Sequence, residues 1–331
     1  MRLVVRLRQV MDSRNVGPVD LSRALGMNRD QVAAIRDRKF KEVSRRDLQA
    51  LWTWTKRFGG DFLDLEPDPV WDTFAGSAAT VILGHVERDI EIMTRMTKVM
   101  RSKLVGANFN RIWEQRYTAT QVAEKMKTEN CVFIGAPKRN RTSEFAYAQL
   151  YGADPDDVSQ ANCEKLPVRF AAVGWTETGQ STVSVEAVSD VSDSGLLVRH
   201  GKQTVQLPVN YLADHKYEGW SGRGIDGGAL IICRKPFKTK ANVTTIIIAG
   251  FTGLSSAEIT EDLIWEMTDI EASELKPGHP VARILKVPYR KLKLRSEREA
   301  TDTDRAWFDP DKVSSEEWRR VTGKPEPALP R

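Results

Sequence analysis

The chain has 331 residues, of which 40% are hydrophobic and 29% charged, and its formal net charge is +5. These fractions are those of an ordinary soluble globular protein. The length predicts about two domains with a substantial buried core. No apolar run approaches the roughly twenty residues that a membrane-spanning helix needs, so a membrane partner is not expected.

The cysteines and histidines indicate a cytoplasmic protein without a metal site or other cofactor. Cys131, Cys163 and Cys233 are far apart and form no CxxC or CxxxH pattern, which favours reduced thiols over a zinc site. The first fourteen residues are interrupted by arginines and lack the apolar core of a signal peptide. The histidines have no second ligand at metal-binding spacing; they are His85, His200, His215 and His279.

Two short helices joined by a tight turn are predicted near the N-terminus, after an amphipathic helix over residues 3–11. Gly17 and Pro18 suit the cap and the first position of a helix, because proline already has helical φ and its missing N–H is not needed there. Gly26 tolerates the left-handed φ that ends many helices. The first of the two helices is therefore expected to end at Leu25.

The second helix of this pair is expected to bury one face and present the other. Asn28 can cap it, and Val32 and Ile35 share its apolar face. A further helix is expected from Ser44 to Phe58, before a pair of glycines. The residues off the apolar face of the second helix are Arg29, Asp30, Gln31 and Ala33.

This pattern resembles the helix-turn-helix of the Cro/lambda-repressor type, and the likeness covers residues 1–60. One departure is Ser22, where that family more often has alanine, and another is the absence of room for an N-terminal arm. The resemblance implies that the second helix lies in the major groove of double-stranded DNA, with Arg29 on guanine and Gln31 on adenine. The base-reading residues that it implies are Asn28, Arg29, Asp30, Gln31 and Ala33.

The charge of the chain is concentrated on the same segment. Residues 1–60 hold fourteen Lys and Arg against six Asp and Glu, a net charge of +8, so the other residues carry −3. A basic head on a slightly acidic body is the electrostatic pattern of a DNA-binding domain attached to something else. The alternative is a helical packing module whose arginines are merely solvated. The residues expected near phosphates are Arg36, Arg38, Lys39, Lys41, Arg45 and Arg46.

Composition changes predict four segments. Residues 1–60 form the helix-turn-helix domain, and residues 61–70, with two prolines and several acids, form a linker. Residues 71–280 form an α/β domain expected to sense a ligand and to dimerise. Residues 281–331 are expected to hold a basic strand and a charged tail.

Short apolar runs that end in glycine and precede helices indicate parallel strands. They are Thr80–Gly84, followed by a helix over 86–104, and Cys131–Gly135, followed by a helix over 142–151. A Rossmann-like layered domain is the expected assembly. Two further apolar strands, 228–234 and 244–250, are expected to complete its sheet. Shorter strands are expected to form an extra hairpin region, at 168–175, 182–188, 195–200 and 204–207. The fold class is therefore multidomain, with an all-α head and an α/β Rossmann-like body.

Two loops at strand ends carry the residues suited to a ligand. In open α/β sheets ligands bind outside the carboxyl ends of strands, where glycines admit the ligand and helix N-termini offer free N–H groups to an anion. Neither loop contains GxGxxG or a Walker A sequence, so ordinary capped turns remain the alternative. The expected ligand-binding residues are Gly135, Lys138, Arg139, Asn140, Gly250, Thr252, Gly253 and Ser255.

No catalytic residue is predicted, so the protein is not expected to be an enzyme. There is no GxSxG elbow, and Cys131 lies in an apolar strand that disfavours a thiolate. The leading hypothesis is a transcriptional regulator, a repressor rather than an activator, that binds a palindromic operator as a homodimer and senses a nucleotide-like or other anionic effector. The alternative is a nucleotide- or nucleoside-processing enzyme tethered or autoregulated by a helix-turn-helix domain. The glycine loops favour this alternative, and the lack of an acid, base or nucleophile weighs against it.

Overall fold

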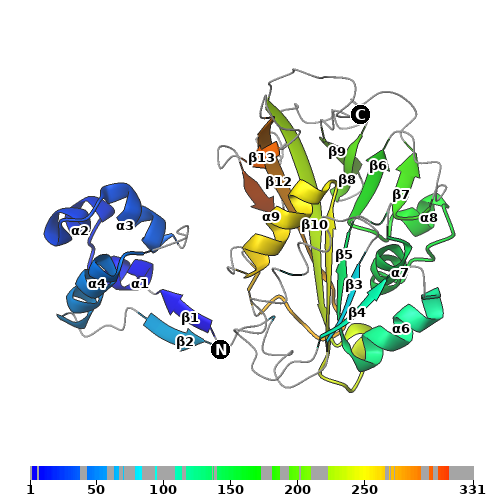
Figure 1. Ribbon diagram of the computed structural model, residues 1–331, viewed down its shortest axis with the longest axis horizontal. Helices are drawn as coiled ribbons and strands as arrows, with labels where there is room; N and C mark the ends of the chain where they lie inside the picture. Colours follow the sequence, from blue (N-terminus) through cyan, green and yellow to red (C-terminus); the bar gives the residue numbers. More distant parts are fainter. Residues whose placement is uncertain are drawn as a thin grey trace. The chain divides into compact units, whose positions relative to one another are not determined.

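The computed structural model divides the chain into an N-terminal unit, Met1–Asp72, and a C-terminal unit, Thr73–Arg331 (Figure 1). The expected helix over 86–104 lies outside the described residues, apart from Thr94. The structure describes residues 2–5, 7–37, 43–57, 63–66, 70, 79–83, 94, 109–113, 117–135, 137, 140–172, 181–186, 194–200, 203–209, 223–264, 268, 270–271, 273–291, 298–300 and 305–312.

The N-terminal unit combines helices with a small antiparallel sheet. Its helices are α1 (Leu7–Ser13), α2 (Pro18–Leu25), α3 (Arg29–Arg36) and α4 (Arg45–Arg57), and its strands are β1 (Arg2–Val5) and β2 (Leu63–Glu66). Their packed apolar side chains include Leu7, Met11, Leu21, Val32, Ile35 and Leu51, each at most 1% exposed. The expected pair of short helices is therefore present, with its apolar faces in one core.

The prediction of an all-α head over residues 1–60 was wrong at its N-terminal end, and the expected linker contains a strand. Residues 3–5, expected as the start of a helix over 3–11, belong to β1, and residues 63–66, expected as linker, form β2. The two strands pair from Arg2 opposite Glu66 to Val5 opposite Leu63. The β-branched pair at Val4 and Val5 favours an extended chain, and the pairing satisfies backbone groups that a linker would leave to water.

The large sheet of the C-terminal unit contains eight of the described strands. Four neighbours are parallel: β11 (Thr244–Gly250), β5 (Asn130–Ile134), β3 (Ala79–Leu83) and β4 (Phe109–Trp113). The antiparallel part runs outward from β11 through β10 (Arg223–Arg234) and β12 (Val281–Lys291), which pairs with β13 (Arg298–Ala300) and β14 (Ala306–Phe308).

This mixed sheet corrects the expectation of a Rossmann-like parallel layer. The strands predicted at 228–234 and 244–250 do join the central sheet, but as an antiparallel hairpin. Their short connection, which contains the 3-10 turn η6 (Pro236–Lys238), cannot make the crossover that parallel neighbours need. The basic strand predicted after residue 280 is β12, which pairs with β10 over ten residues and so belongs to the sheet rather than to a tail.

Helices lie on both faces of the large sheet. In Figure 1, α6 (Ala119–Thr128) and α7 (Arg141–Leu150) lie on one side and α9 (Gly253–Ile264) lies on the other. The central strands β3, β5 and β11 are buried along their whole length, which explains their unbroken apolar sequences. Among the helices that the structure describes, none is long and apolar enough to cross a membrane.

A second sheet of four strands stands where the extra hairpin region was expected. Its order is β7 (Ser184–Glu186), β6 (Val168–Ala172), β8 (Gly195–His200) and β9 (Gln203–Pro208), and the short helix α8 (Gln160–Cys163) precedes β6. One face joins the same core as Tyr147 of α7, through Val168, Phe170, Leu196, Val198 and Leu207. Among the described strands of this sheet, β8 and β9 form a hairpin, whereas β6 and β7 are parallel.

Candidate functional site

The turn between α2 and α3 is built on a glycine with left-handed backbone angles. Gly26 has φ of 64°, in the left-handed region, and its N–H donates to the carbonyl of Ser22. The N–H of Met27 donates to the same carbonyl at 3.0 Å. A Cβ at Gly26 would meet nothing within 4 Å, so it is the dihedral angle and not space that calls for glycine.

The first turn of α3 is open to solvent while its apolar face is buried. Asn28 caps the helix, its Oδ1 accepting the N–H of Asp30 at 2.7 Å. Asn28, Arg29 and Asp30 are exposed, whereas Val32 and Ile35 are fully buried. Three of the five residues expected to read bases are therefore exposed to solvent on the same turn of the helix. Among the residues that the structure describes, the guanidinium of Arg29 has no partner.

Gln31 and Ala33 are less accessible than the sequence suggested. Both are half-buried, and the Gln31 amide donates to Asp47 of α4 at 2.9 Å. Asp47 also accepts the hydroxyl of Ser44 at 2.7 Å. In this conformation the Gln31 amide is used inside the protein, and an adenine contact would require it to leave Asp47.

The residues expected near phosphates fall into three groups. Arg36 pairs with Asp37 through two hydrogen bonds, at 2.7 and 2.8 Å, and Arg8 binds the same carboxylate at 2.6 Å. The hydrogen bond from Arg36 holds the pKa of Asp37 well below its usual range. Arg36 is thus partly neutralised, whereas Arg46 is exposed on α4. Arg38, Lys39 and Lys41 lie outside the described residues, as does the side chain of Arg45.

The two glycine loops begin side by side, as their parallel strands require. Ile134 of β5 lies opposite Ile248 of β11, and the N–H of Gly135 donates to the Ile248 carbonyl at 3.1 Å. Both loops therefore leave the same edge of the sheet. Lys138 and Arg139 lie outside the described residues, so the cationic half of the expected site has no described geometry.

At the start of α9, where an anionic ligand was expected, the structure has the carboxylate of Asp226. Asp226 of β10, which is fully buried, accepts the N–H of Ser255 at 3.1 Å and the hydroxyl of Thr252. It also accepts the N–H of Gly227 at 2.8 Å. Burial raises the pKa of Asp226, and these hydrogen bonds oppose the rise. Thr252 and Ser255, expected as ligand-binding residues, are therefore already used.

Gly250 is needed for helix packing rather than for a ligand. A Cβ at this position would overlap the backbone nitrogen of Ser256. The N–H of Gly250 instead donates to the Ser256 hydroxyl at 3.2 Å. Gly253 is the first residue of α9 and is half-buried. The close approach leaves no opening between this strand end and the helix, so the loop gives no support to a phosphate site.

Asn140, expected to orient a ligand group, is a buried helix cap. Its Oδ1 accepts the N–H of Ser143 at 3.0 Å, and its Nδ2 donates to the carbonyl of Ile134 at 3.0 Å. The side chain is fully buried. The acceptor caps α7 and the donor binds the end of β5, so the side chain joins the helix to the strand. This is a structural role.

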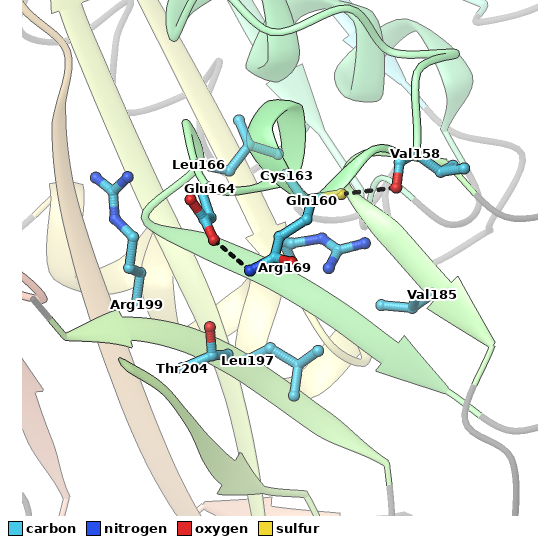
Figure 2. Close-up of a pocket in the computed structure, with 10 residues that line it drawn as sticks. All are labelled: Val158, Gln160, Cys163, Glu164, Leu166, Arg169, Val185, Leu197, Arg199 and Thr204. Atoms are coloured by element: carbon cyan, nitrogen blue, oxygen red, sulfur yellow. Dashed lines mark hydrogen bonds between the residues drawn. The ribbon is translucent and has the colours of Figure 1, made fainter. Parts of the chain in front are cut away.

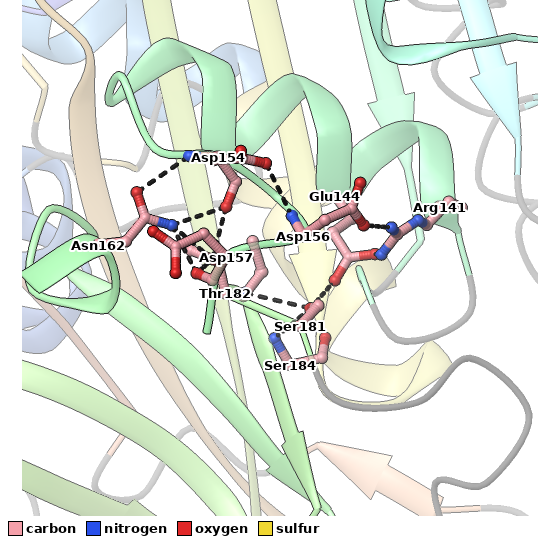
Figure 3. Close-up of polar contacts among 10 residues, drawn as sticks. Arg141, Glu144, Asp154, Asp156, Asp157, Asn162, Ser181, Thr182 and Ser184 are labelled. Atoms are coloured by element: carbon pink, nitrogen blue, oxygen red, sulfur yellow. Dashed lines mark hydrogen bonds and ion pairs between the residues drawn. The ribbon is translucent and has the colours of Figure 1, made fainter. Parts of the chain in front are cut away.

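A buried polar cluster near the start of α7 was not foreseen from the sequence (Figure 3). Glu144 is 2% exposed and accepts from Arg141 and from the hydroxyl of Ser181. Burial raises the pKa of Glu144. The amide of Asn162 donates to the carbonyls of Asp154 and Asp157, both at 2.7 Å. These bonds join segments up to 37 positions apart, which no local pattern in the sequence signals.

A groove lies between α8 and the open face of the second sheet, with a volume of about 370 Å³. It too was missed, because its lining comes from four strands and a short helix. No group of three or more His, Cys, Asp or Glu within the described ranges is arranged to hold a metal ion. Comparison of the chain with protein-family models, with curated proteins and with solved structures finds no match.

Proposed function

We propose that the protein is a sequence-specific DNA-binding regulator whose helix α3 reads bases in the major groove. The observation that carries this proposal is the left-handed turn at Gly26 between two helices whose apolar faces share one core. It leaves Asn28, Arg29 and Asp30 exposed on one helical turn. A recognition helix docks by such an N-terminal turn.

Charge supports the same proposal independently. Residues 1–60 carry a net charge of +8 while the remaining chain carries −3. Arg29 and Arg46 are exposed without partners among the described residues, so both are available to DNA. We assign Arg29 to bases and Arg46 to phosphates, since Arg29 opens α3 whereas Arg46 lies in the first turn of α4.

The C-terminal unit would supply dimerisation and the response to a small-molecule effector. Two copies of α3 related by a twofold axis would read a palindromic operator whose half-sites lie about one helical turn apart. An effector changes operator affinity only if it binds one arrangement of the dimer more tightly than another. The loop at α9 is not the proposed effector site, because Asp226 fills it.

Selection of genomic fragments by the full-length protein tests the proposal. Fragments that are retained at physiological salt and share a sequence would define the operator. Arg29→Ala should cost about 1–3 kcal/mol on that operator and relax the preference at one base pair. Arg46→Ala is the matched variant: it should weaken all DNA alike and reduce the salt dependence by about one counterion.

Two results would overturn the proposal. One is that no shared sequence is enriched among the bound fragments. The other is that Arg29→Ala keeps both the affinity and the base preference of the unmodified protein, since α3 would then not be the reading element. Calorimetric unfolding of each variant guards against a loss caused by misfolding, because Arg29 and Arg46 are exposed and should be neutral to stability.

A further inference from the structure

The connection between β10 and β11 holds an exposed phenylalanine on a strained backbone. Lys235, Phe237 and Lys238 have φ of 47°, 57° and 55°, in the left-handed region that residues other than glycine rarely adopt. Asn15 is the one other non-glycine residue with positive φ in the described ranges. Phe237 is nevertheless 40% exposed, so the strained turn does not bury its ring. Backbone strain of this kind persists only where the surrounding contacts impose it, and it gathers at functional sites.

Contacts with two other parts of the chain hold this turn in place. The hydroxyl of Thr239 donates at 3.1 Å to the carbonyl of Lys127, in the last turn of α6. The N–H of Gly278, just before β12, donates to the carbonyl of Arg234 at 2.7 Å. A Cβ at Gly278 would overlap the side chain of Lys238, which therefore lies against this glycine. Three segments that are distant in the sequence thus meet at one end of the large sheet.

Two of the segments that meet here are strongly basic. Residues 234–242 and 276–280 contain five Lys and Arg and no Asp or Glu, although residues 61–331 together carry a net charge of −3. These cations and the exposed ring form what we call the basic end: Arg234, Lys235, Phe237, Lys238, Lys240 and Lys276. The acids of the neighbouring segments are already paired with other cations. The ion pairs are Glu124 with Lys127, Glu129 with Lys125, and Glu274 with Arg283 and Lys312.

The basic end differs in this respect from the groove on the second sheet, which contains both signs of charge. Figure 2 shows Arg169 and Arg199 directed to opposite ends of that groove, with the Glu164 carboxylate and the Gln160 amide between them. The basic end contains no acid, and its cations are spread over two segments instead of meeting at one point. Such a surface matches a partner whose negative charges are also spread, which is a polyanion.

We propose that the basic end binds the phosphate backbone of double-stranded DNA outside the bases that α3 reads. Lysine ammonium groups bind phosphates as point charges and need no fixed geometry. The ring of Phe237 would add an apolar contact to the DNA between phosphates. The choice of DNA among polyanions rests on the proposed function, because the basic end is tethered to a head that binds the duplex.

Fluorescence anisotropy of the full chain with a labelled duplex of arbitrary sequence, measured over a series of salt concentrations, tests the proposal. Lys238→Gln should weaken binding and reduce the slope of log affinity against log salt by about 0.9, the release of one counterion. Lys165→Gln removes the same charge at an exposed position between α8 and β6 and should leave the slope unchanged. The melting temperature of each variant shows whether it remains folded.

Phe237→Ala separates the apolar contact from the charges. It should weaken binding by about fivefold at every salt concentration and leave the slope unchanged, because no charge is lost. Vesicles of phosphatidylserine and a polyglutamate chain are the two comparison partners, since they carry spread negative charge without a nucleic acid. We expect the duplex to bind more tightly than either of them.

The proposal is overturned if Lys238→Gln keeps the salt slope, if Lys165→Gln reduces it as much, or if Phe237→Ala leaves the affinity unchanged. It is also overturned if vesicles or polyglutamate bind more tightly than the duplex, since the partner would then be a membrane or an acidic protein. None of these results depends on base reading by α3, which is measured by the operator preference of Arg29→Ala. Failure of the basic end and failure of the reading helix are therefore distinguishable.

Discussion

The starts of α3 and α9 have similar sequences, but the first is exposed to solvent and the second is occupied by a carboxylate of the protein. Each follows a glycine and a capping polar residue, and each offers unpaired backbone N–H groups at a helix N-terminus. At α3 the cap is the adjacent Asn28, and the first turn is open to solvent. At α9 the buried carboxylate of Asp226 accepts the N–H of Ser255 and the hydroxyl of Thr252. The start of α3 is therefore open to an external ligand, whereas the start of α9 is closed by the carboxylate of Asp226, and we call it sealed.

The difference teaches that a helix N-terminus is a binding site only where the protein brings no acceptor of its own. Asp226 is 29 positions before Ser255, and it reaches α9 because β10 pairs antiparallel with β11. In the N-terminal unit α3 contacts α1 and α2, and the cap of its first turn comes from the adjacent Asn28. The surroundings of a helix start, rather than its local sequence, therefore decide its role.

Replacing Asp226 by alanine should have the largest effect and tests whether α9 is sealed by this carboxylate. The variant leaves the buried N–H groups of Ser255 and Gly227 and the half-buried hydroxyl of Thr252 without this acceptor, so the C-terminal unit should lose about 3 kcal/mol of unfolding free energy. Calorimetry of the full chain measures this loss. Asp311→Ala, at an exposed acid of the same unit, is the matched control and should be near neutral.

Formate sharpens the same test, because it supplies a carboxylate without the side chain. It should raise the melting temperature of Asp226→Ala and leave the unmodified chain unchanged, since the start of α9 would then be open to an external anion. A variant as stable as the unmodified chain would contradict the comparison, since the carboxylate would then not be what satisfies the donors at α9.

Two glycine substitutions separate close approach from backbone conformation. Gly250→Ala forces a Cβ against the nitrogen of Ser256, and should cost about 2–3 kcal/mol through displacement of α9. Gly26→Ala meets no atom and only has to adopt φ of 64°, which should cost about 1–2 kcal/mol. Urea unfolding, followed separately for each unit, measures both. The reverse order of costs would show that α9 can shift away from β11 without strain.

Local signals predicted the elements well and their partners poorly. The strand at 195–200 matches β8 at both ends, and the predicted helix end at Leu25 is that of α2. These succeeded because residue periodicity and glycine φ are local properties. Strand order is not local: nothing in residues 281–291 alone says that they pair with β10, and so the mixed sheet was taken for a Rossmann-like one.

The partners of the expected ligand-binding residues could not be predicted for the same reason, because those partners are set by the fold and not by the local sequence. Thr252, Ser255 and Asn140 have the chemistry of an anion site, but each is already bonded within the protein. Conversely, Lys238 and Lys276 drew no notice in the sequence, since 38 positions separate them and only the pairing of β10 with β12 brings their segments together. At α3, where cap and helix are adjacent in the chain, sequence and structure agree on Asn28.

The smallest predicted difference in unfolding free energy is between substitutions at two asparagine caps, Asn28 of α3 and Asn140 of α7. Asn28→Asp keeps an acceptor for the Asp30 N–H at an exposed cap, so the N-terminal unit should keep its stability within about 0.5 kcal/mol. Asn140→Asp keeps the acceptor for Ser143 but loses the Nδ2 donor to the buried Ile134 carbonyl. The C-terminal unit should then lose about 1–3 kcal/mol.

Calorimetry on the full chain reads both units in one experiment, and alanine at each position provides the reference for a cap that is lost altogether. The replacement by aspartate should rescue most of the alanine loss at residue 28 and little of it at residue 140. The Asn140 donor binds the Ile134 carbonyl, whereas the Asn28 donor has no partner among the residues that the structure describes. Equal rescue at both positions would mean that the Ile134 contact contributes nothing, and the distinction between an open and a sealed helix start would then rest on Asp226 alone.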